Sequence, residues 1–504
     1  MGVSENEVPV VDIGGAAVVP YLPRITLDWL RDAPGERHRA LNGTMAFVDI
    51  SGFTAMSERL APKGRLSAEE VTDVMSATFG RLLGVAYELG GGLLKLGGDA
   101  LLLFFDGDGH AARACAAAWG MRDSLDALGP LETSVGPVEL KMHVGVHSGD
   151  FDFFLVGSRH RELIVAGPDA VVTVDMEDTA EAGEIAVSEA TAAHLSAASL
   201  GDRKGAGTLL SLPPTVAFTG IAELPDTSDL DLLGCIPEEL RAHLVAERVE
   251  SEHRQAAVAF VRFGGEALDT DAVEEVVDVV QEAAAAHGVC FLESDIDAVG
   301  GRIILVAGVP TTAGGHEERL LRTVRSAVDA GTRLPLHVGV ASGNVFAGRV
   351  GPAYRQAFTI LGGTAALAAR LMAKADARSI WTTPDLLERS RTIFATQPVG
   401  ALSLKGKAEP VDAVAVGEVT GTRERKAPKK LPLVDRQREL PVLDAALVPV
   451  RMGFGSFVEL VGDAGIGKSR IVEELCDRAE GLTLVSAACE QYESTLPTTR
   501  SGSC

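Results

Sequence analysis

The sequence predicts an α+β protein in which two similar modules are followed by the beginning of an α/β domain. One pattern of apolar runs, glycines and helical stretches occurs twice, in the same order and with similar spacing. Near the end of the chain, an apolar run, a glycine-rich loop and a helical stretch follow one another directly. At roughly 100–200 residues per domain, a chain of 504 residues is compatible with this organisation.

The repeat is visible in three pairs of segments. The first copy contains "MAFVDISGFTAM", "GGLLKLGGDALLLFF" and "KMHVGVHSGDF", and the second contains "AAVAFVRFGGEAL", "DAVGGRIILVAGVP" and "LPLHVGVASGNVFAGRVG". Short apolar runs bounded by glycine, such as Leu101–Phe105 and Ile303–Ala307, predict strands. The stretches Ala68–Leu89 and Asp271–Ala286 predict helices between them. Each copy is therefore expected to be one α+β module.

Changes in composition divide the chain into parts. Gly, Pro and Asp turns separate the two copies, and the basic segment "GTRERKAPKK" follows the second. The expected parts are an N-terminal segment (1–40), a first module (41–190), a linker (191–252), a second module (253–418), a basic linker (419–431) and a partial α/β domain (432–504).

The composition excludes some partners and locations. A net charge of -24 and a pI of about 4.9 disfavour nucleic acid and anionic membranes as partners. No apolar stretch reaches the roughly 18 residues of a membrane span. The acidic N-terminus lacks the basic region of a signal peptide, and six scattered cysteines without a CxxC pair predict reduced thiols. A cytoplasmic protein is expected.

Two aspartates of the first module occupy strand ends. Asp49 ends an apolar run, and Asp99 lies in the turn of "KLGGDALLLFF". If the two strands are neighbours, the carboxylates project from one edge and repel each other unless cations lie between them. Such ligands suit Mg²⁺ or Mn²⁺, and a metal pair about 3.5–4 Å apart can activate an attacking oxygen and stabilise a leaving phosphate. The helix start at Ile50–Thr54 offers free N–H groups to a polyphosphate. Solvated turn residues are the alternative interpretation.

"FVDISGFT" and "KLGGDALLLFF" resemble the metal-binding segments of class III nucleotide cyclases, with similarity from Pro20 to Val416. The double module with a following P-loop is most similar to soluble, bicarbonate-responsive adenylyl cyclases. The resemblance implies ferredoxin-like modules that pair head to tail as a pseudo-heterodimer, with the active site at their interface. The residues that it implies in the metal-donor half are Asp49, Ile50 and Asp99 for two metal ions and Phe53 and Thr54 for the substrate.

The resemblance implies that the second module completes the site. In "FTILGGTAALAARLM", Arg370 falls on the family's transition-state arginine, and its charged fork suits a phosphoryl group. Thr359 falls on the base-recognition position, where a hydroxyl suits adenine. Ala366 replaces the family's asparagine, a loss that typically costs about 10²–10³ in rate, or roughly 3–4 kcal/mol. The usual adenine-contacting lysine is also absent, with Glu293 or Ala298 near its place. Slow or conditional catalysis is expected.

The two modules are not interchangeable in this interpretation. At the places of the family's asparagine and arginine, the first module carries Val171 and Asp175. Near the places of the metal aspartates, the second carries Arg262 and Arg302. One complete site per pair of modules is therefore expected.

Several basic residues have more than one interpretation. Lys95 resembles the lysine that helps to bind bicarbonate in responsive relatives, although the following helix offers no arginine; a solvated turn lysine is the alternative. His143, which His337 matches in the second module, is either a phosphate contact or a strand histidine. Lys405 and Lys407 in "LKGKAEP" resemble the family's late phosphate-binding lysine.

"GDAGIGKS" matches the P-loop pattern GxxxxGK[ST] and follows the predicted strand Phe457–Val461. Its glycines allow backbone N–H groups to approach phosphates, its lysine neutralises β/γ charge and its serine can bind Mg²⁺. No Walker B aspartate follows, so nucleotide binding is expected from an incomplete NTPase domain. The motif residues are Gly462, Gly465, Gly467, Lys468 and Ser469.

The expected function is an adenylyl cyclase that converts ATP to cyclic AMP and pyrophosphate, with its two modules paired within a monomer or homo-oligomer. Bicarbonate or another small effector is a possible further ligand. The alternative is a weak or inactive cyclase-homology pair that binds nucleotide and regulates a signalling NTPase. A stand-alone NTPase is the third and weakest alternative.

Overall fold

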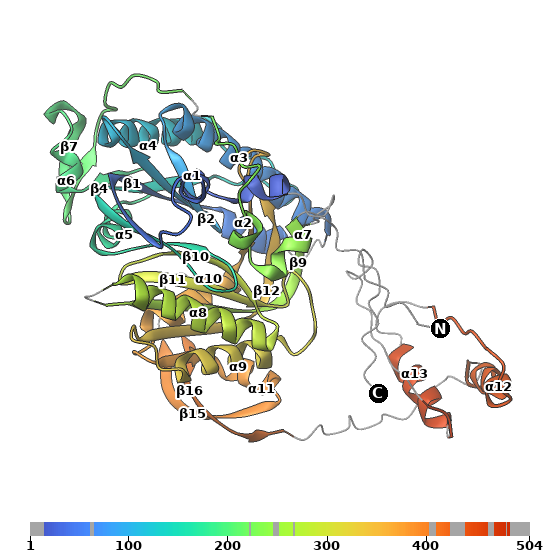
Figure 1. Ribbon diagram of the computed structural model, residues 1–504. Coiled ribbons are helices and arrows are strands. Elements are labelled where there is room, and N and C mark those ends of the chain that lie inside the picture. Colours follow the sequence, from blue (N-terminus) through green and yellow to red (C-terminus); the bar gives the residue numbers. More distant parts are fainter. Residues whose placement is uncertain are drawn as a thin grey trace. The chain divides into compact units, whose positions relative to one another are not determined.

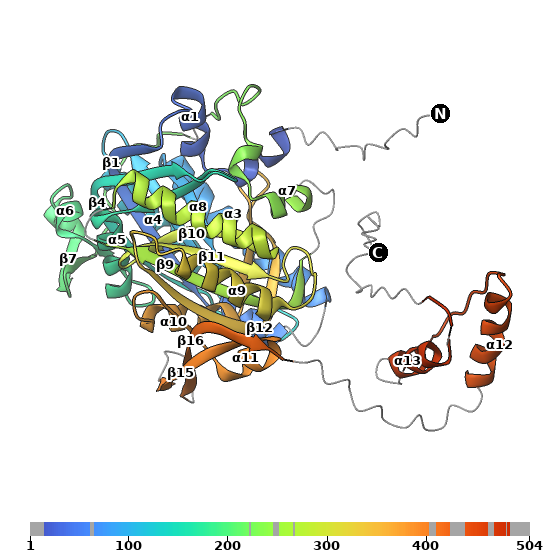
Figure 2. The ribbon, with the colours of Figure 1, turned by 60° about the horizontal axis from the view of Figure 1, so that its bottom comes forward.

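The first of two compact units, Met1–Arg423, contains two mixed β-sheets with helices packed against them, which confirms the predicted α+β fold (Figures 1 and 2). The second unit is Glu424–Cys504. The computed structural model describes residues 15–60, 65–220, 223–244, 251–265, 268–402, 410–423, 439–461, 468–479 and 481–483.

The two sheets have the same topology. The strand orders are β2-β3-β1-β4-β6-β8-β7, with β5 paired to β4, and β10-β11-β9-β12-β14-β16-β15, with β13 paired to β12. The first sheet comprises β1 (His38–Ser51), β2 (Gly92–Gly97), β3 (Ala100–Asp106), β4 (Lys141–Val156), β5 (Glu162–Ala166), β6 (Ile185–Val187), β7 (Leu200–Lys204) and β8 (Gly207–Leu210). The second comprises β9 (Glu252–Gly264), β10 (Cys290–Asp297), β11 (Gly300–Ala307), β12 (Leu336–Val350), β13 (Ala357–Leu361), β14 (Ser379–Thr382), β15 (Thr392–Leu402) and β16 (Val411–Thr422).

Helices occupy both sides of each sheet (Figure 2). Those before and within the first module are η1 (Gly15–Tyr21), α1 (Arg24–Asp32), α2 (Phe53–Leu60), α3 (Arg65–Glu88), α4 (His110–Asp126), α5 (Pro168–Thr179), α6 (Glu189–Ala192) and η3 (Ala197–Ser199). Those of the connection and the second module are η4 (Leu233–Cys235), α7 (Glu238–Leu244), α8 (Thr270–His287), α9 (His316–Asp329), α10 (Gly363–Lys374) and α11 (Pro384–Arg389). The predicted strands and helices of the repeat all form. The first sheet continues through β7 and β8, which lie in the region that the sequence assigns to a linker.

Local sequence explains where these elements begin and end. Helix α8 begins where the Asp269 carboxylate accepts a hydrogen bond from the Ala272 amide at 2.7 Å. It ends at Gly288, whose φ of 62° is a left-handed conformation that glycine adopts without strain. Successive side chains of strand β1 point to opposite faces of the sheet. Met45 and Phe47 face the second module, and Ala46 and Val48 face α3 and α4.

The two modules pack through a shared apolar core. Side chains of both sheets, of α1 and of α7 enter this core. The β4–β5 arm also reaches into the core of the second module, with Phe154 and Ile164 buried there. The β12–β13 arm places Phe346 and Leu361 in the core of the first module. Each module therefore completes the other, as the sequence predicted for an intramolecular pair.

The second unit contains α12 (Glu439–Arg451) and α13 (Lys468–Arg478). The predicted strand Phe457–Val461 is wrong, because these residues have no regular secondary structure. A strand needs a hydrogen-bonded neighbour, and the described residues of this unit supply none.

Candidate active site between the two modules

Strand pairing brings the two predicted metal ligands to one edge of the first sheet. Asp49 stands opposite Ala100 in the β1–β3 ladder, so Asp99, in the turn before β3, lies beside the end of β1. The Asp99 carbonyl accepts a hydrogen bond from the Ile50 amide at 3.2 Å. The Asp99 carboxylate accepts another from the Thr54 hydroxyl at 3.0 Å, which ties the start of α2 to the same edge.

The environment of Asp99 suits a bound cation. Burial raises the pKa of the Asp99 carboxyl, against the opposing effects of the Thr54 hydrogen bond and the Arg302 charge. A buried carboxylate is stabilised by an adjacent positive charge, and two aspartates at one edge form a hard oxygen donor set of the kind that Mg²⁺ and Mn²⁺ prefer. The side chains present therefore fit divalent metal ions.

Two of the predicted residues can reach a ligand only through their backbone. The Ile50 side chain is fully buried in the core beneath α3. The Phe53 ring is also fully buried, with its centroid 5.6 Å from that of Phe79. The side chains of both residues anchor the loop that joins β1 to α2.

The structure adds a residue that the sequence analysis missed, Glu177 of α5. His143 stands opposite Asp49 in the β1–β4 ladder. The His143 Nε2 atom lies 2.7 Å from a Glu177 carboxylate oxygen and 3.8 Å from Asp49 Oδ2. The sequence spacing offered a signal for this contact. Two histidines, at 143 and 147, lie on one face of a strand, and two carboxylates, at 169 and 177, lie on one side of the following helix.

The second module touches the metal edge through Thr359. This residue of β13 is fully buried, and its hydroxyl accepts a hydrogen bond from the Gly98 amide at 3.1 Å. The Asp295 carboxylate, which pairs with Arg302, lies against Gly97 in the same turn. The base-recognition candidate is thus already bonded to the turn that carries Asp99.

Arg370 lies on α10, one turn beyond Ala366. Its side chain is half-buried, and it makes no hydrogen bond or ion pair with the residues that the structure describes. Ala366 offers no polar side-chain atom at its position. Because none of the described residues pairs with it, the Arg370 guanidinium is available to an anionic ligand.

Comparison with known proteins identifies the family. Residues 36–206 and 316–416, which are just over half of the chain, match the adenylate and guanylate cyclase catalytic domain. The chain belongs to this cyclase family. Residues 432–503 match the AAA ATPase domain, the region that contains the P-loop motif.

Adenylate cyclase type 10 of the rat (Rattus norvegicus) is 23% identical over 388 residues, which cover 66% of this chain and 24% of the rat protein. The rabbit (Oryctolagus cuniculus) protein is 23% identical over 505 residues, covering 87% of this chain and 31% of its own length. The chain thus spans about a quarter to a third of these curated relatives, to which it is homologous. A crystal structure of a class III adenylyl cyclase-like ATP-binding protein from Pseudomonas aeruginosa shares the fold, with a TM-score of 0.51 at 12% identity over 74% of this chain and 89% of that one.

The structure contradicts the interpretation of Lys95 as a solvated turn lysine. Its ammonium group donates hydrogen bonds to Glu162 at 2.6 Å and to Ser294 of the second module at 2.9 Å. Burial opposes ionisation of Glu162, but Lys95 and His160 outweigh it and lower the pKa of that carboxyl to about 2. Lys95 is therefore largely buried and paired with Glu162, and the structure gives no support to the prediction that it binds bicarbonate.

Strand register shows which residue of the second module matches Lys95 of the first. Strands β2 and β10 each contain an irregularity, and the residues that follow it are Lys95 and Glu293. Glu293, rather than Ala298, therefore occupies the matching place. Burial and the neighbouring Asp295 raise the pKa of Glu293 to about 8. The position that matches Lys95 thus holds a buried acid whose pKa is raised.

The other predicted residues lie at or beyond the limits of the described structure. Lys405 and Lys407 lie outside the described residues, as do Gly462, Gly465 and Gly467. Lys468 and Ser469 form the start of α13. None of the described helices is long and apolar enough to cross a membrane.

Proposed function

We propose that the paired modules form one adenylyl cyclase site, which converts ATP to cyclic AMP and pyrophosphate with two divalent ions, Mg²⁺ or Mn²⁺, held by Asp49, Asp99 and the Ile50 backbone. The observation that carries the proposal is the convergence of Asp49 and Asp99 at a sheet edge that the second module contacts through Thr359. Class III cyclases generally use divalent metal ions.

The described residues support an in-line displacement. Bound metal ions would supply activation of the ribose 3′-hydroxyl and neutralisation of the triphosphate. The 3′-hydroxyl loses its proton to solvent, and its oxygen forms a bond to the α-phosphorus while the bond to pyrophosphate breaks. In this proposal, the N–H groups at the start of α2 and the His143 imidazole hold phosphate oxygens, and Lys405 and Lys407 are further candidates for this role. The Arg370 guanidinium stabilises charge on the transferring phosphoryl group, and the Thr359 hydroxyl contacts adenine.

Several features indicate conditional turnover. Ala366 removes a donor whose loss typically costs about 10²–10³ in rate. The Thr359 hydroxyl accepts a hydrogen bond from Gly98 and is fully buried, so contact with adenine requires this part of the module interface to open. Glu293 replaces a base-contacting lysine, which leaves the choice between ATP and GTP to be measured.

The second candidate function is a nucleotide-binding regulator with little or no turnover. Ala366 and the engaged Thr359 favour it, and a protein of the same fold is described as an ATP-binding cyclase-like protein. In this alternative the modules would regulate the attached AAA region, whose P-loop, Gly462–Ser469, binds a second nucleotide. A cytoplasmic location and a monomeric or homo-oligomeric state remain predictions.

The two candidates are separated by one set of assays. Purified chain is incubated with ATP or GTP and with Mn²⁺ or Mg²⁺, and cyclic nucleotide is measured for wild type, Asp49→Ala and Asp175→Asn. Asp175 is an exposed carboxylate on α5 and serves as the matched control. Metal-dependent product that Asp49→Ala abolishes and Asp175→Asn retains supports the cyclase. Nucleotide binding without product from either nucleotide would refute turnover and leave the regulator.

A further inference from the structure

Three donor atoms from three different elements meet on the β4 side of Asp49. The Asp49 carboxylate, the His143 imidazole and the Glu177 carboxylate each place one ligand atom within 4.8 Å of the other two. His143 Nε2 faces both carboxylates, at 2.7 Å from Glu177 Oε1 and 3.8 Å from Asp49 Oδ2. All three side chains are between 13% and 33% exposed, so the cluster is open to small solutes yet largely enclosed.

Helix α5 is held tightly against β4, which fixes Glu177. The helix crosses β4 at Gly145, where an added Cβ would lie 2.1 Å from the Glu177 amide nitrogen. Any larger residue at this position would push the helix, and Glu177 with it, away from His143. The close approach thus places the carboxylate beside the imidazole.

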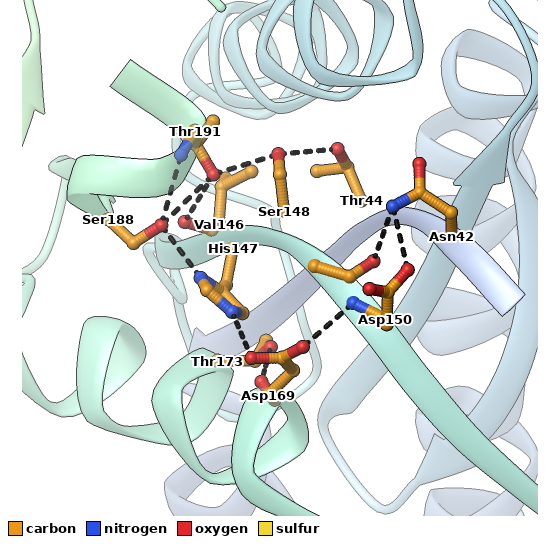
Figure 3. Close-up of polar contacts among 11 residues, drawn as sticks. Asn42, Thr44, Val146, His147, Ser148, Asp150, Asp169, Thr173, Ser188 and Thr191 are labelled. Atoms are coloured by element: carbon orange, nitrogen blue, oxygen red, sulfur yellow. Dashed lines mark hydrogen bonds and ion pairs between the residues drawn. The ribbon is translucent and has the colours of Figure 1, made fainter. Parts of the chain in front are cut away.

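A hydrogen-bond network fixes the other end of α5 (Figure 3). His147 lies 2.8 Å from the Ser188 hydroxyl through Nδ1 and 3.0 Å from the Asp169 carboxylate through Nε2. The Asp169 carboxylate also accepts a hydrogen bond from the Asp150 amide at 2.7 Å. Two histidine–carboxylate pairs therefore attach α5 to β4, one at each end of the helix. Donors that rigid elements hold in place lose little freedom when they bind a metal.

We propose that Asp49, His143 and Glu177 form a binding site for one divalent transition-metal ion, filled before nucleotide binds. The inference builds on the proposed function, because Asp49 belongs to both sites. The second site differs in its location and chemistry. It extends toward β4 and α5, whereas the Asp49–Asp99 pair extends toward β3.

The donor set favours Zn²⁺, then Mn²⁺, over Mg²⁺. Imidazole nitrogen suits zinc and other transition metals, whereas Mg²⁺ prefers oxygen ligands in an octahedron. With bonds of about 2.0–2.1 Å, neighbouring ligand atoms of a tetrahedral zinc site lie roughly 3.3–3.4 Å apart. The observed separations from His143 Nε2, 2.7 and 3.8 Å, fall on either side of this value, and all three ligand atoms lie within 4.8 Å of one another, so modest side-chain shifts would bring them to a zinc geometry.

The second module provides an internal comparison. His337 stands opposite Arg262 in the β12–β9 ladder, where His143 stands opposite Asp49. The Arg262 guanidinium lies 3.3 Å from His337 Nδ1, which also contacts the Ala375 carbonyl at 2.8 Å. A cation at that position excludes a metal ion, so one such site is expected among the described residues of the two modules.

The test is isothermal titration of the nucleotide-free, full-length chain with Zn²⁺, Mn²⁺ and Mg²⁺. One equivalent of Zn²⁺ is expected to bind more tightly than Mn²⁺, with Mg²⁺ the weakest. Glu177→Gln and His143→Gln should each weaken Zn²⁺ binding at least about tenfold. Asp175→Asn, the matched carboxylate control on α5, should stay within about twofold of wild type. Variants are compared only where circular dichroism shows the wild-type fold, and the second ligand variant serves if the first fails to fold.

Asp99→Asn separates the two metal sites. It should leave Zn²⁺ binding within about twofold of wild type, because Asp99 is not a ligand of the proposed site. Loss of Zn²⁺ binding in Asp99→Asn, or wild-type binding in both Glu177→Gln and His143→Gln, would overturn the inference. So would the absence of Zn²⁺ binding to wild type. None of these results depends on turnover, so the cyclase proposal can fail or survive independently.

Discussion

Replacement of Lys95 by methionine should strongly destabilise the first unit. Lys95 and Glu162 are only 11% and 9% exposed, and their charged atoms are 2.6 Å apart. Lys95→Met keeps a side chain of similar length but leaves the Glu162 carboxylate buried without its main partner. The Ser294 hydroxyl, which donates to Glu162 at 2.6 Å, cannot replace a full positive charge.

Two independent routes give the same magnitude. The pKa of Glu162 is about 2 against an ordinary value of 4.5, a difference of roughly 3 kcal/mol that is the balance of burial, which raises the pKa, and of Lys95 and His160, which lower it. Removal of one partner from a buried ion pair typically costs about 3–5 kcal/mol. Because both groups are shielded from water, little of this is lost to screening. We expect the free energy of unfolding to fall by about 3 kcal/mol at pH 7.

Urea unfolding followed by circular dichroism measures the effect. Lys141→Met is the matched control, because Lys141 is 52% exposed and its pair with Glu139 should contribute less than about 1 kcal/mol. Lys95→Met/Glu162→Gln should recover much of the loss, since no charge is then left buried without a partner. The pair's contribution should be present above about pH 4.5 and disappear as the pH falls toward 2, because folding lowers the pKa of Glu162.

Equal stability of Lys95→Met and wild type would refute the reasoning. So would a double variant no more stable than Lys95→Met, because the cost would then come from lost packing rather than from an unpaired carboxylate. Stabilisation of wild type by bicarbonate, abolished in Lys95→Met, would mean that Lys95 is open to an external anion after all.

Other positions give predictions of different kinds. Ala366→Asn should raise cyclase turnover, measured as cyclic nucleotide formed, by up to about 10²–10³-fold. Ala373→Asn, on the exposed side of α10, is the control and should not raise it. Equal rates for Ala366→Asn and wild type would exclude the assigned donor position. Thr359→Val leaves the Gly98 amide without its acceptor and should lower the free energy of unfolding by about 1–3 kcal/mol in urea, while Thr359→Ser should retain it. Glu293→Gln should stabilise the chain at pH 8 by on the order of 1–4 kcal/mol and by little below about pH 4.5. Folding raises the pKa of Glu293, so the stability of the wild type falls as the pH rises between these values. Urea unfolding curves without this pH dependence would contradict the assignment.

The sequence was sufficient for those features that local pattern determines. Apolar runs and glycine turns are short-range signals, so β3, β11, α3 and α8 could be located, and the repeat then implied two equivalent sheets. The meeting of Asp49 and Asp99 followed because both end strands that are neighbours in the sheet. The strand predicted at Phe457–Val461 shows the limit of such reasoning, since a strand also depends on a partner that local pattern does not supply.

The missed features depend on contacts between distant segments. Glu162 is 67 residues from Lys95, and Ser294 is in the other module, so the sequence alone could not show that Lys95 is neutralised. Glu177 reaches His143 only because α5 packs on β4 at Gly145. The choice between Glu293 and Ala298 required the strand irregularities that β2 and β10 share.

The two modules carry opposite charges at matching strand positions. In the first module, the strand-end position holds Asp49, a carboxylate that faces a histidine and another carboxylate. In the second it holds Arg262, and the adjacent Arg302 forms an ion pair with Asp295. The second module therefore pairs its arginine with its own carboxylate, whereas the first groups Asp49 and Glu177 around one histidine. Ligand dependence is thus concentrated at one of two otherwise equivalent edges, the edge that Thr359 also contacts.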